Sequence, residues 1–132
     1  MQNGEDSHRH PVPVMDAIRA RPVLRTDAPP DSGYGNERVL SAASTWEIAI
    51  KYSLGKLELP EPPSQFIPSR MALTLTSSMA VEIAHTFLVS RLPFHHRDLF
   101  DRLLTAQAQL EKLPLLTADD VFEKYDVEII RP

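Results

Sequence analysis

Carboxylates gather around one short apolar segment near the C-terminal end of this 132-residue chain. Asp98 and Asp101 begin a stretch with helical periodicity, and Asp119 follows the apolar run at 113–116. In open α/β sheets ligands bind outside the carboxyl ends of the strands, where a residue such as Asp119 is expected. Carboxylate oxygens are also the hard ligands that Mg²⁺ prefers. The spacing therefore suggests a metal site that handles phosphate groups.

Each of these carboxylates also has an ordinary structural explanation. Asp98 and Asp101 fall in a first helical turn, where carboxylates satisfy free N–H groups and oppose the helix dipole. Asp101 is the more interesting of the two, because its flanking Phe100 and Leu103 place it close to buried surface. Asp119 can act simply as the cap of a short helix beginning at residue 120. Both interpretations stay open from the spacing alone.

Glu47 lies further upstream, at the margin of the apolar face of a second predicted helix. Ser44 and Glu47 have the spacing of a capping box, and Glu47 and Lys51 have that of a favourable i,i+4 ion pair. A structural role explains this residue on its own. Glu47 becomes a candidate ligand only if the fold carries it to the other carboxylates.

Other catalytic chemistries find little support. Four of the five histidines form the pairs His8/His10 and His95/His96, neither with the i,i+4 spacing of a helical zinc site. The chain has no cysteine, no glycine-rich phosphate loop and no Gly-x-Ser-x-Gly motif. The net charge of −4 argues against a nucleic-acid binder that relies on bulk electrostatic attraction. Arg97 and Arg102 are the nearest candidates for phosphate contacts, although Arg102 can also pair with Asp98.

The elements that must position these residues alternate along the chain from about residue 37. Strands are predicted at 39–40, 73–76, 113–116 and 127–130, and helices at 41–54, 64–72, 78–89, 98–110 and 120–125, with Gly55 ending the first helix. Strands that alternate with helices predict a parallel sheet covered on both faces.

Residues 1–36 have a different character. Five prolines and most of the glycine interrupt every apolar run, which predicts a divergent and disordered or poorly packed arm ahead of one domain at 37–132. The chain contains no run of eighteen apolar residues, and its N-terminus lacks the pattern of a signal peptide. We therefore expect a cytoplasmic protein with no membrane segment.

Four motifs in order resemble those of the PIN-domain family, in particular VapC-type toxins of bacterial toxin–antitoxin pairs. They read Ser41-Ala-Ala-Ser-Thr-Trp-Glu-Ile-Ala-Ile-Lys, Gly55-Lys-Leu-Glu-Leu-Pro, Pro93-Phe-His-His-Arg-Asp-Leu-Phe-Asp-Arg-Leu-Leu-Thr-Ala-Gln-Ala and Leu116-Thr-Ala-Asp. The resemblance runs from about residue 36 to the C-terminus. It implies a three-layer α/β/α sandwich with a mainly parallel sheet, and a ribonuclease that depends on Mg²⁺ or Mn²⁺. The family's catalytic and metal-binding acidic residues map onto Glu47, Asp101 and Asp119, with Thr117 beside them.

The start of the chain departs from this family, which opens with a buried central strand ending in Asp. The nearest candidate is the segment 12–18 with Asp16, but Pro13 removes a ladder donor from a central strand. Asp16 is therefore a doubtful fourth ligand, and the central strand is expected to be missing or degenerate through divergence or a shifted reading frame. The hypotheses are an active toxin and an inactive PIN remnant, with a dimerisation module third. The resemblance implies a small antitoxin, an RNA substrate and a homodimer.

Overall fold

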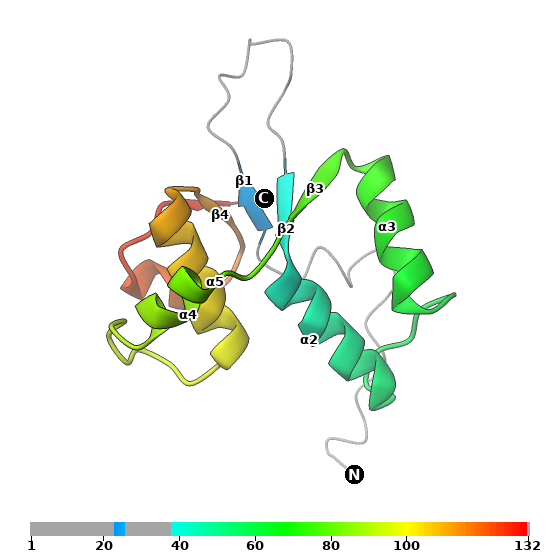
Figure 1. The fold of residues 1–132 in the computed structure, drawn as a ribbon, viewed down its shortest axis with the longest axis horizontal. Coiled ribbons are helices and arrows are strands. Elements are labelled where there is room, and N and C mark those ends of the chain that lie inside the picture. Colours follow the sequence, from blue (N-terminus) through cyan, green and yellow to red (C-terminus); the bar gives the residue numbers. More distant parts are fainter. Residues whose placement is uncertain (1–22, 26–37, 132) are drawn as a thin grey trace.

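A five-stranded sheet forms the centre of the molecule (Figure 1). The computed structural model describes residues 23–25 and 38–131, so the predictions made for the rest of the segment 1–36, including Asp16, lie outside the described residues. The strand order is β3-β2-β1-β4-β5. The strands are β1 (Val23–Arg25), β2 (Arg38–Ser41), β3 (Thr76–Met79), β4 (Leu115–Leu116) and β5 (Ile129–Ile130).

The central strand β1 runs against all the others. Leu24 is opposite Val39 of β2 on one side and Leu115 of β4 on the other, and both pairings are antiparallel. Strands β2 and β3 pair in parallel, as do β4 and β5. Four of the five strands therefore point the same way. The sequence predicted that the central strand is missing or degenerate. The structure does have a central strand, but it is three residues long, runs antiparallel to both neighbours and comes from 23–25 rather than 12–18.

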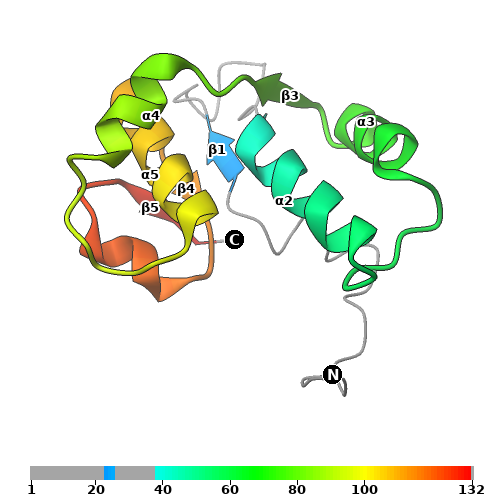
Figure 2. The ribbon, with the colours of Figure 1, turned by 60° about the horizontal axis from the view of Figure 1, so that its bottom comes forward.

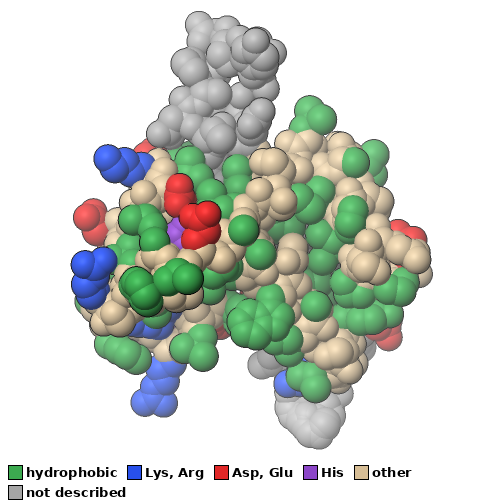
Figure 3. All heavy atoms as spheres, in the orientation of Figure 1, with side chains coloured by type: hydrophobic (Ala, Val, Ile, Leu, Met, Phe, Trp, Pro, Cys, Tyr) green, Lys and Arg blue, Asp and Glu red, His purple; other side chains and the backbone are tan. Residues whose placement is uncertain are grey.

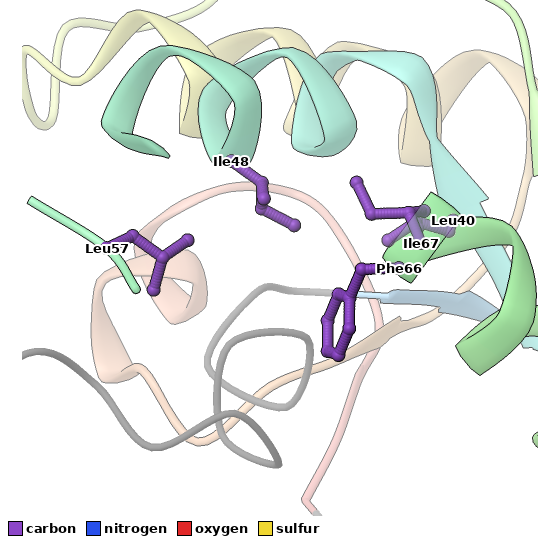
Figure 4. Close-up of a cluster of buried hydrophobic side chains, with 5 residues drawn as sticks. All are labelled: Leu40, Ile48, Leu57, Phe66 and Ile67. Atoms are coloured by element: carbon purple, nitrogen blue, oxygen red, sulfur yellow. The ribbon is translucent and has the colours of Figure 1, made fainter. Parts of the chain in front are cut away.

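Alternate residues of β2 face opposite sides of the sheet, as the strand period of two requires. Leu40 packs against α2 (Ala42–Ser53) and α3 (Pro63–Leu73) in the cluster drawn in Figure 4, while Val39 packs against α5 (Leu99–Glu111). Figure 2 shows α2 on one side of β1, with α5 and α4 (Ile83–Val89) on the other. The layers are thus helix, sheet and helix.

The two ends of α2 test the predicted capping box and the predicted role of Gly55. Ser41 is the N-cap, and its hydroxyl accepts a hydrogen bond from the N–H of Ala43 at 3.0 Å. The predicted capping box of Ser44 and Glu47 is therefore wrong, because the helix begins three residues earlier. Gly55 does end the helix, with a φ of +73° that a residue without Cβ adopts readily.

The segment around β3 corrects the predicted boundaries. The alternation at 73–76 was interpreted as a strand, but Leu73 ends α3 and Leu75 turns the chain with a φ of 53°. Strand β3 starts only at Thr76, opposite Arg38, and α4 starts at Ile83 rather than at residue 78. The short helix η1 (Asp120–Lys124) agrees with its prediction. In the described part of the chain, no helix has the length and apolar character needed to cross a bilayer.

Candidate metal-binding site

The carboxyl edge of the sheet gathers the elements that carry the predicted site residues. Strand β2 leads directly into α2, which carries Glu47, and β4 leads into the loop that carries Asp119. Both strands run antiparallel to β1, so they end at the same edge. Helix α5 connects through three residues to the start of β4, which puts its first turn, with Asp101, toward that edge as well. The rings of Trp46 and Phe100, 5.2 Å apart, join α2 to the start of α5.

Among the described carboxylates, Asp101 is the one whose pKa clearly departs from its ordinary value. Its side chain is 20% exposed, and its Oδ2 lies 3.2 Å from Nε2 of His96. Burial and the nearby charges of Asp98 and Glu47 raise its pKa to about 6, although the hydrogen bond and charge of His96 act in the opposite direction. The charge of Glu47 has the smallest of these effects, so Glu47 lies near enough to Asp101 to act on it through its charge.

Glu47 is itself buried, with a side chain 12% exposed. Its Oε2 lies 3.4 Å from Nζ of Lys51, which confirms the predicted i,i+4 pair. A partly exposed lysine neutralises one side of the carboxylate. Glu47 is therefore a buried carboxylate that is ion-paired on its own helix.

Asp119 keeps to local contacts in the loop after β4. Its Oδ1 accepts a hydrogen bond from the N–H of Val121 at 3.0 Å, and its own N–H donates to Oγ1 of the buried Thr117 at 3.0 Å. The capping role foreseen for Asp119 is therefore confirmed. Asp119 is exposed and is not among the groups that shift the pKa of Asp101. Asp119 therefore stays exposed in the loop after β4, whereas the charge of Glu47 acts on Asp101.

The prediction for Arg102 is wrong. This side chain is only 4% exposed, so it neither pairs with Asp98 nor lies on the surface as a phosphate contact. Its guanidinium donates to the backbone carbonyls of Val89, Leu92 and Pro93 and to the hydroxyl of Tyr125. The loop after α4 captures the arginine because its carbonyls need donors inside the protein. Arg97 is exposed, as a phosphate contact requires.

His96 is a residue that the sequence did not single out for this site. The adjacent histidines were weighed only as zinc ligands, whereas Nε2 of His96 binds Asp101 and its Nδ1 lies 3.1 Å from the hydroxyl of Tyr125. The useful signal was the position of His96 just before a helix whose first turn carries Asp101. His95 instead is exposed and contacts the ring of Tyr125 edge-on.

A family model for the PIN domain matches residues 16–128. The chain belongs to the PIN domain family. The α/β fold class expected from the sequence is confirmed by this match together with the helical layers on both sides of a sheet in which four of five strands point the same way. The match begins at Asp16, twenty residues before the resemblance found from the motifs.

A curated relative points the same way. This PIN domain is 44% identical over 79 residues to Ribonuclease VapC16 of Mycobacterium tuberculosis, an alignment that includes 60% of this chain and 52% of that protein. The chain thus spans about half the length of the curated relative it matches. No solved structure matches it significantly. The PIN-domain family recognised from the sequence is confirmed. The relative is a VapC ribonuclease, the type whose motifs the sequence resembles.

The residues at the carboxyl edge of this PIN domain fit a divalent cation. Glu47 and Asp101 supply hard oxygen ligands within electrostatic reach of each other, and their repulsion helps to raise the pKa of Asp101. A cation between them would remove that repulsion. Asp119 completes the set only if the loop after β4 turns its carboxylate inward.

In the described part of the chain, one group of three possible metal ligands has its atoms close together, and it lies at the other end of α5. Potential ligand atoms of Glu82, His85 and Glu111 all lie within 4.8 Å of one another, and Figure 3 shows acidic side chains beside a histidine over α4 and α5. However, Nδ1 of His85 accepts the backbone N–H of Glu82 at 2.9 Å, so a neutral ring carries its proton on Nε2, which faces Glu111 at 2.8 Å. A metal at Nε2 would have to displace that proton. This group is therefore a structural link between α4 and α5.

Proposed function

We propose that this PIN domain is a metal-dependent endoribonuclease, the toxin of a VapC-type toxin–antitoxin pair. The observation that carries the proposal is that a buried carboxylate, Glu47, and a half-buried one, Asp101, lie on elements that meet at the carboxyl edge of the sheet, near enough for the charge of Glu47 to act on Asp101. A PIN family match and the printed name of the relative, a ribonuclease, support the choice of reaction.

In this proposal Glu47, Asp101 and Asp119 are the catalytic and metal-binding residues, with Mg²⁺ or Mn²⁺ as cofactor. The cation supplies Lewis-acid activation of water and neutralises charge on the phosphate under attack. Glu47 and Asp101 hold and orient the cation through their oxygens. Burial and the charges of Asp98 and Glu47 raise the pKa of Asp101 to about 6 in the metal-free protein, and a bound cation would lower it again, so Asp101 would be an ionised ligand near neutral pH.

The partners and location follow the same reasoning. We propose an RNA substrate, a small antitoxin protein, a homodimer and a cytoplasmic location. RNA reaches an acidic site through the cation, which is consistent with a net charge of −4. We further propose that residues 1–36 are a divergent opening to a PIN-like domain at 37–132, although β1 shows that part of this segment enters the sheet.

Calorimetric titration with Mn²⁺, paired with a cleavage assay on RNA in the presence and absence of a chelator, tests the proposal. The parent is expected to bind Mn²⁺, and Glu47→Gln, Asp101→Asn and Asp119→Asn are each expected to weaken binding. Glu111→Gln is the matched control, because it removes a carboxylate from the opposite end of α5. A parent that neither binds Mn²⁺ nor cleaves RNA would favour the inactive PIN remnant instead.

Asp119→Asn carries separate information. If it leaves Mn²⁺ affinity unchanged while Glu47→Gln and Asp101→Asn do not, the site consists of the carboxylates of α2 and α5, and Asp119 only caps η1. If all three substitutions act alike, the loop after β4 closes on the cation.

A further inference from the structure

A chain of hydrogen bonds leads from the buried side chain of Arg102 through Tyr125 and His96 to the carboxylate of Asp101. The guanidinium of Arg102 cannot accept a hydrogen bond, so its Nη1 donates to the hydroxyl oxygen of Tyr125 at 3.3 Å. The Tyr125 hydroxyl then has its single proton left to donate, and Nδ1 of His96 lies 3.1 Å away. The oxygen could also accept through its second lone pair, but among the described residues Nδ1 of His96 is the only acceptor for the proton of this buried hydroxyl, so Tyr125 donates to it.

This order fixes the tautomer of His96. A ring that accepts at Nδ1 and is neutral carries its proton on Nε2, and that N–H donates to Oδ2 of Asp101 at 3.2 Å. The rings of Phe122 and Tyr125 meet the imidazole edge-on, at 6.3 and 5.7 Å, and hold its plane. The imidazole is thus held by packing as well as by hydrogen bonds.

The backbone of Asp101 is held from two further sides. Its N–H donates to Oδ1 of Asp98 at 3.0 Å, and its carbonyl accepts the hydroxyl of Thr105 at 2.8 Å. Only the carboxylate of Asp101 is then still able to rotate, and the hydrogen bond from His96 fixes its orientation. Carboxylates that bind metals are themselves oriented by such outer hydrogen bonds.

We infer that His96 is a positioning residue, which receives its tautomer from Arg102 and Tyr125 and holds the Asp101 carboxylate in the orientation that binds the cation. This inference rests on the proposed function, because it concerns the same site. The residue acts through Asp101 and touches neither substrate nor cation.

Mn²⁺ titration of four variants tests the inference. His96→Ala is expected to weaken Mn²⁺ binding by about 10–100-fold, the usual cost of losing an outer-shell partner. His96→Gln is expected to restore most of the affinity, since its amide N–H can replace Nε2–H. Tyr125→Phe keeps the ring but removes the donor to Nδ1, so a smaller loss is expected. His95→Ala, which removes the neighbouring ring from Tyr125, is expected to bind like the parent.

A spectroscopic measurement separates positioning from simple packing. The ¹⁵N chemical shifts of His96 are expected to report an Nε2–H tautomer in the metal-free parent, and a mixture of tautomers in Tyr125→Phe. This measurement requires no metal and no cleavage. It also remains informative if His96→Ala fails to fold, because Tyr125→Phe and His96→Gln then carry the comparison.

The two possible failures can be distinguished. A parent that binds Mn²⁺, together with a folded His96→Ala variant of equal affinity, would overturn the role of His96 and leave the proposed function standing. Equal losses in His96→Ala and His95→Ala would overturn it too, since loop packing would then explain both. A parent without Mn²⁺ affinity would remove the proposed function and the inference together.

Discussion

A histidine lies beside a carboxylate at each end of α5, but the two pairs lie in different environments. At the first turn Nε2 of His96 lies 3.2 Å from Oδ2 of Asp101, and at the last turn Nε2 of His85 lies 2.8 Å from Oε2 of Glu111. Ten residues separate the two carboxylates along the helix, or about 15 Å. Each histidine also meets a donor at Nδ1, so both rings carry their proton toward a carboxylate.

What differs is how exposed the carboxylate is, 20% for Asp101 against 37% for Glu111, and which other charges lie nearby. At the last turn the histidine is 1% exposed and the side chain of Glu111 is 37% exposed, so water solvates the negative charge. At the first turn Asp101 is mostly buried, and the charges of Asp98 and Glu47 act on it. The same pair therefore stabilises helix packing at one end, whereas at the other it holds a carboxylate in an environment that favours a proton or a cation.

The largest difference is expected in cleavage. Asp101→Asn should lower the rate of RNA cleavage by about 100–1,000-fold, because it removes a charged ligand from the reacting centre. Glu111→Gln should stay within about twofold of the parent, since single exposed groups contribute little. Rates of Mn²⁺-dependent cleavage under single-turnover conditions measure both. A comparable loss in both variants would mean that the two ends of α5 do not differ in function.

The next largest effect concerns stability at the last turn. His85→Ala should lower the free energy of unfolding by about 2–4 kcal/mol, because it leaves a cavity and removes the partner of the Glu82 N–H and of Glu111. Urea unfolding monitored by circular dichroism measures it. Mn²⁺ affinity should not change in the folded variant. A loss below about 1 kcal/mol would show that α4 packs on α5 without this link.

Stability should also depend on pH through Asp101. Its pKa is raised from 3.8 to about 6 in the fold, so the folded protein binds this proton more tightly than the unfolded chain does. The resulting stabilisation is fully present below about pH 3.8 and is lost as the pH rises through about 6. The shift corresponds to about 2–3 kcal/mol.

Asp101→Asn removes this titration. Metal-free Asp101→Asn should therefore gain stability relative to the parent as the pH rises from 4 to 7, with little difference near pH 4. Urea unfolding of both proteins across this range, in the presence of a chelator, gives the comparison. Parallel pH profiles would show that Asp101 is not held in a charge-disfavouring environment.

The sequence indicated much of the first turn of α5 in advance. The position of Asp101 beside Phe100 and Leu103 predicted a carboxylate close to buried surface, and the resemblance joined it to Glu47. The helix itself was visible from its period. These features depend on local spacing, which the chain carries in its own order.

The features that the sequence did not predict depend on tertiary contacts. Arg102 has the spacing to pair with Asp98, but the carbonyls of 89–93 capture it from across the fold. Strand β1 has three residues in a proline-rich segment, too few for a period, and it exists through its pairing with β2 and β4. His96 was missed because its partners, Asp101 and Tyr125, lie five and 29 residues away.

The smallest effect separates two roles of Asp98 in the first turn. Its carboxylate caps α5 by accepting the N–H of Asp101, and its charge raises the pKa of Asp101. Asp98→Ala removes both roles and should lower the free energy of unfolding by about 1 kcal/mol, whereas Asp98→Asn keeps a capping oxygen and should change it by only a few tenths of a kcal/mol. Both variants should lower the pKa of Asp101, because the neighbouring negative charge is lost in each. A ¹³C NMR titration of the Asp101 carboxyl group, alongside thermal unfolding, measures the two roles separately. If the pKa falls in Asp98→Ala but not in Asp98→Asn, then the geometry of the cap and not the charge of Asp98 sets the first turn apart from the last.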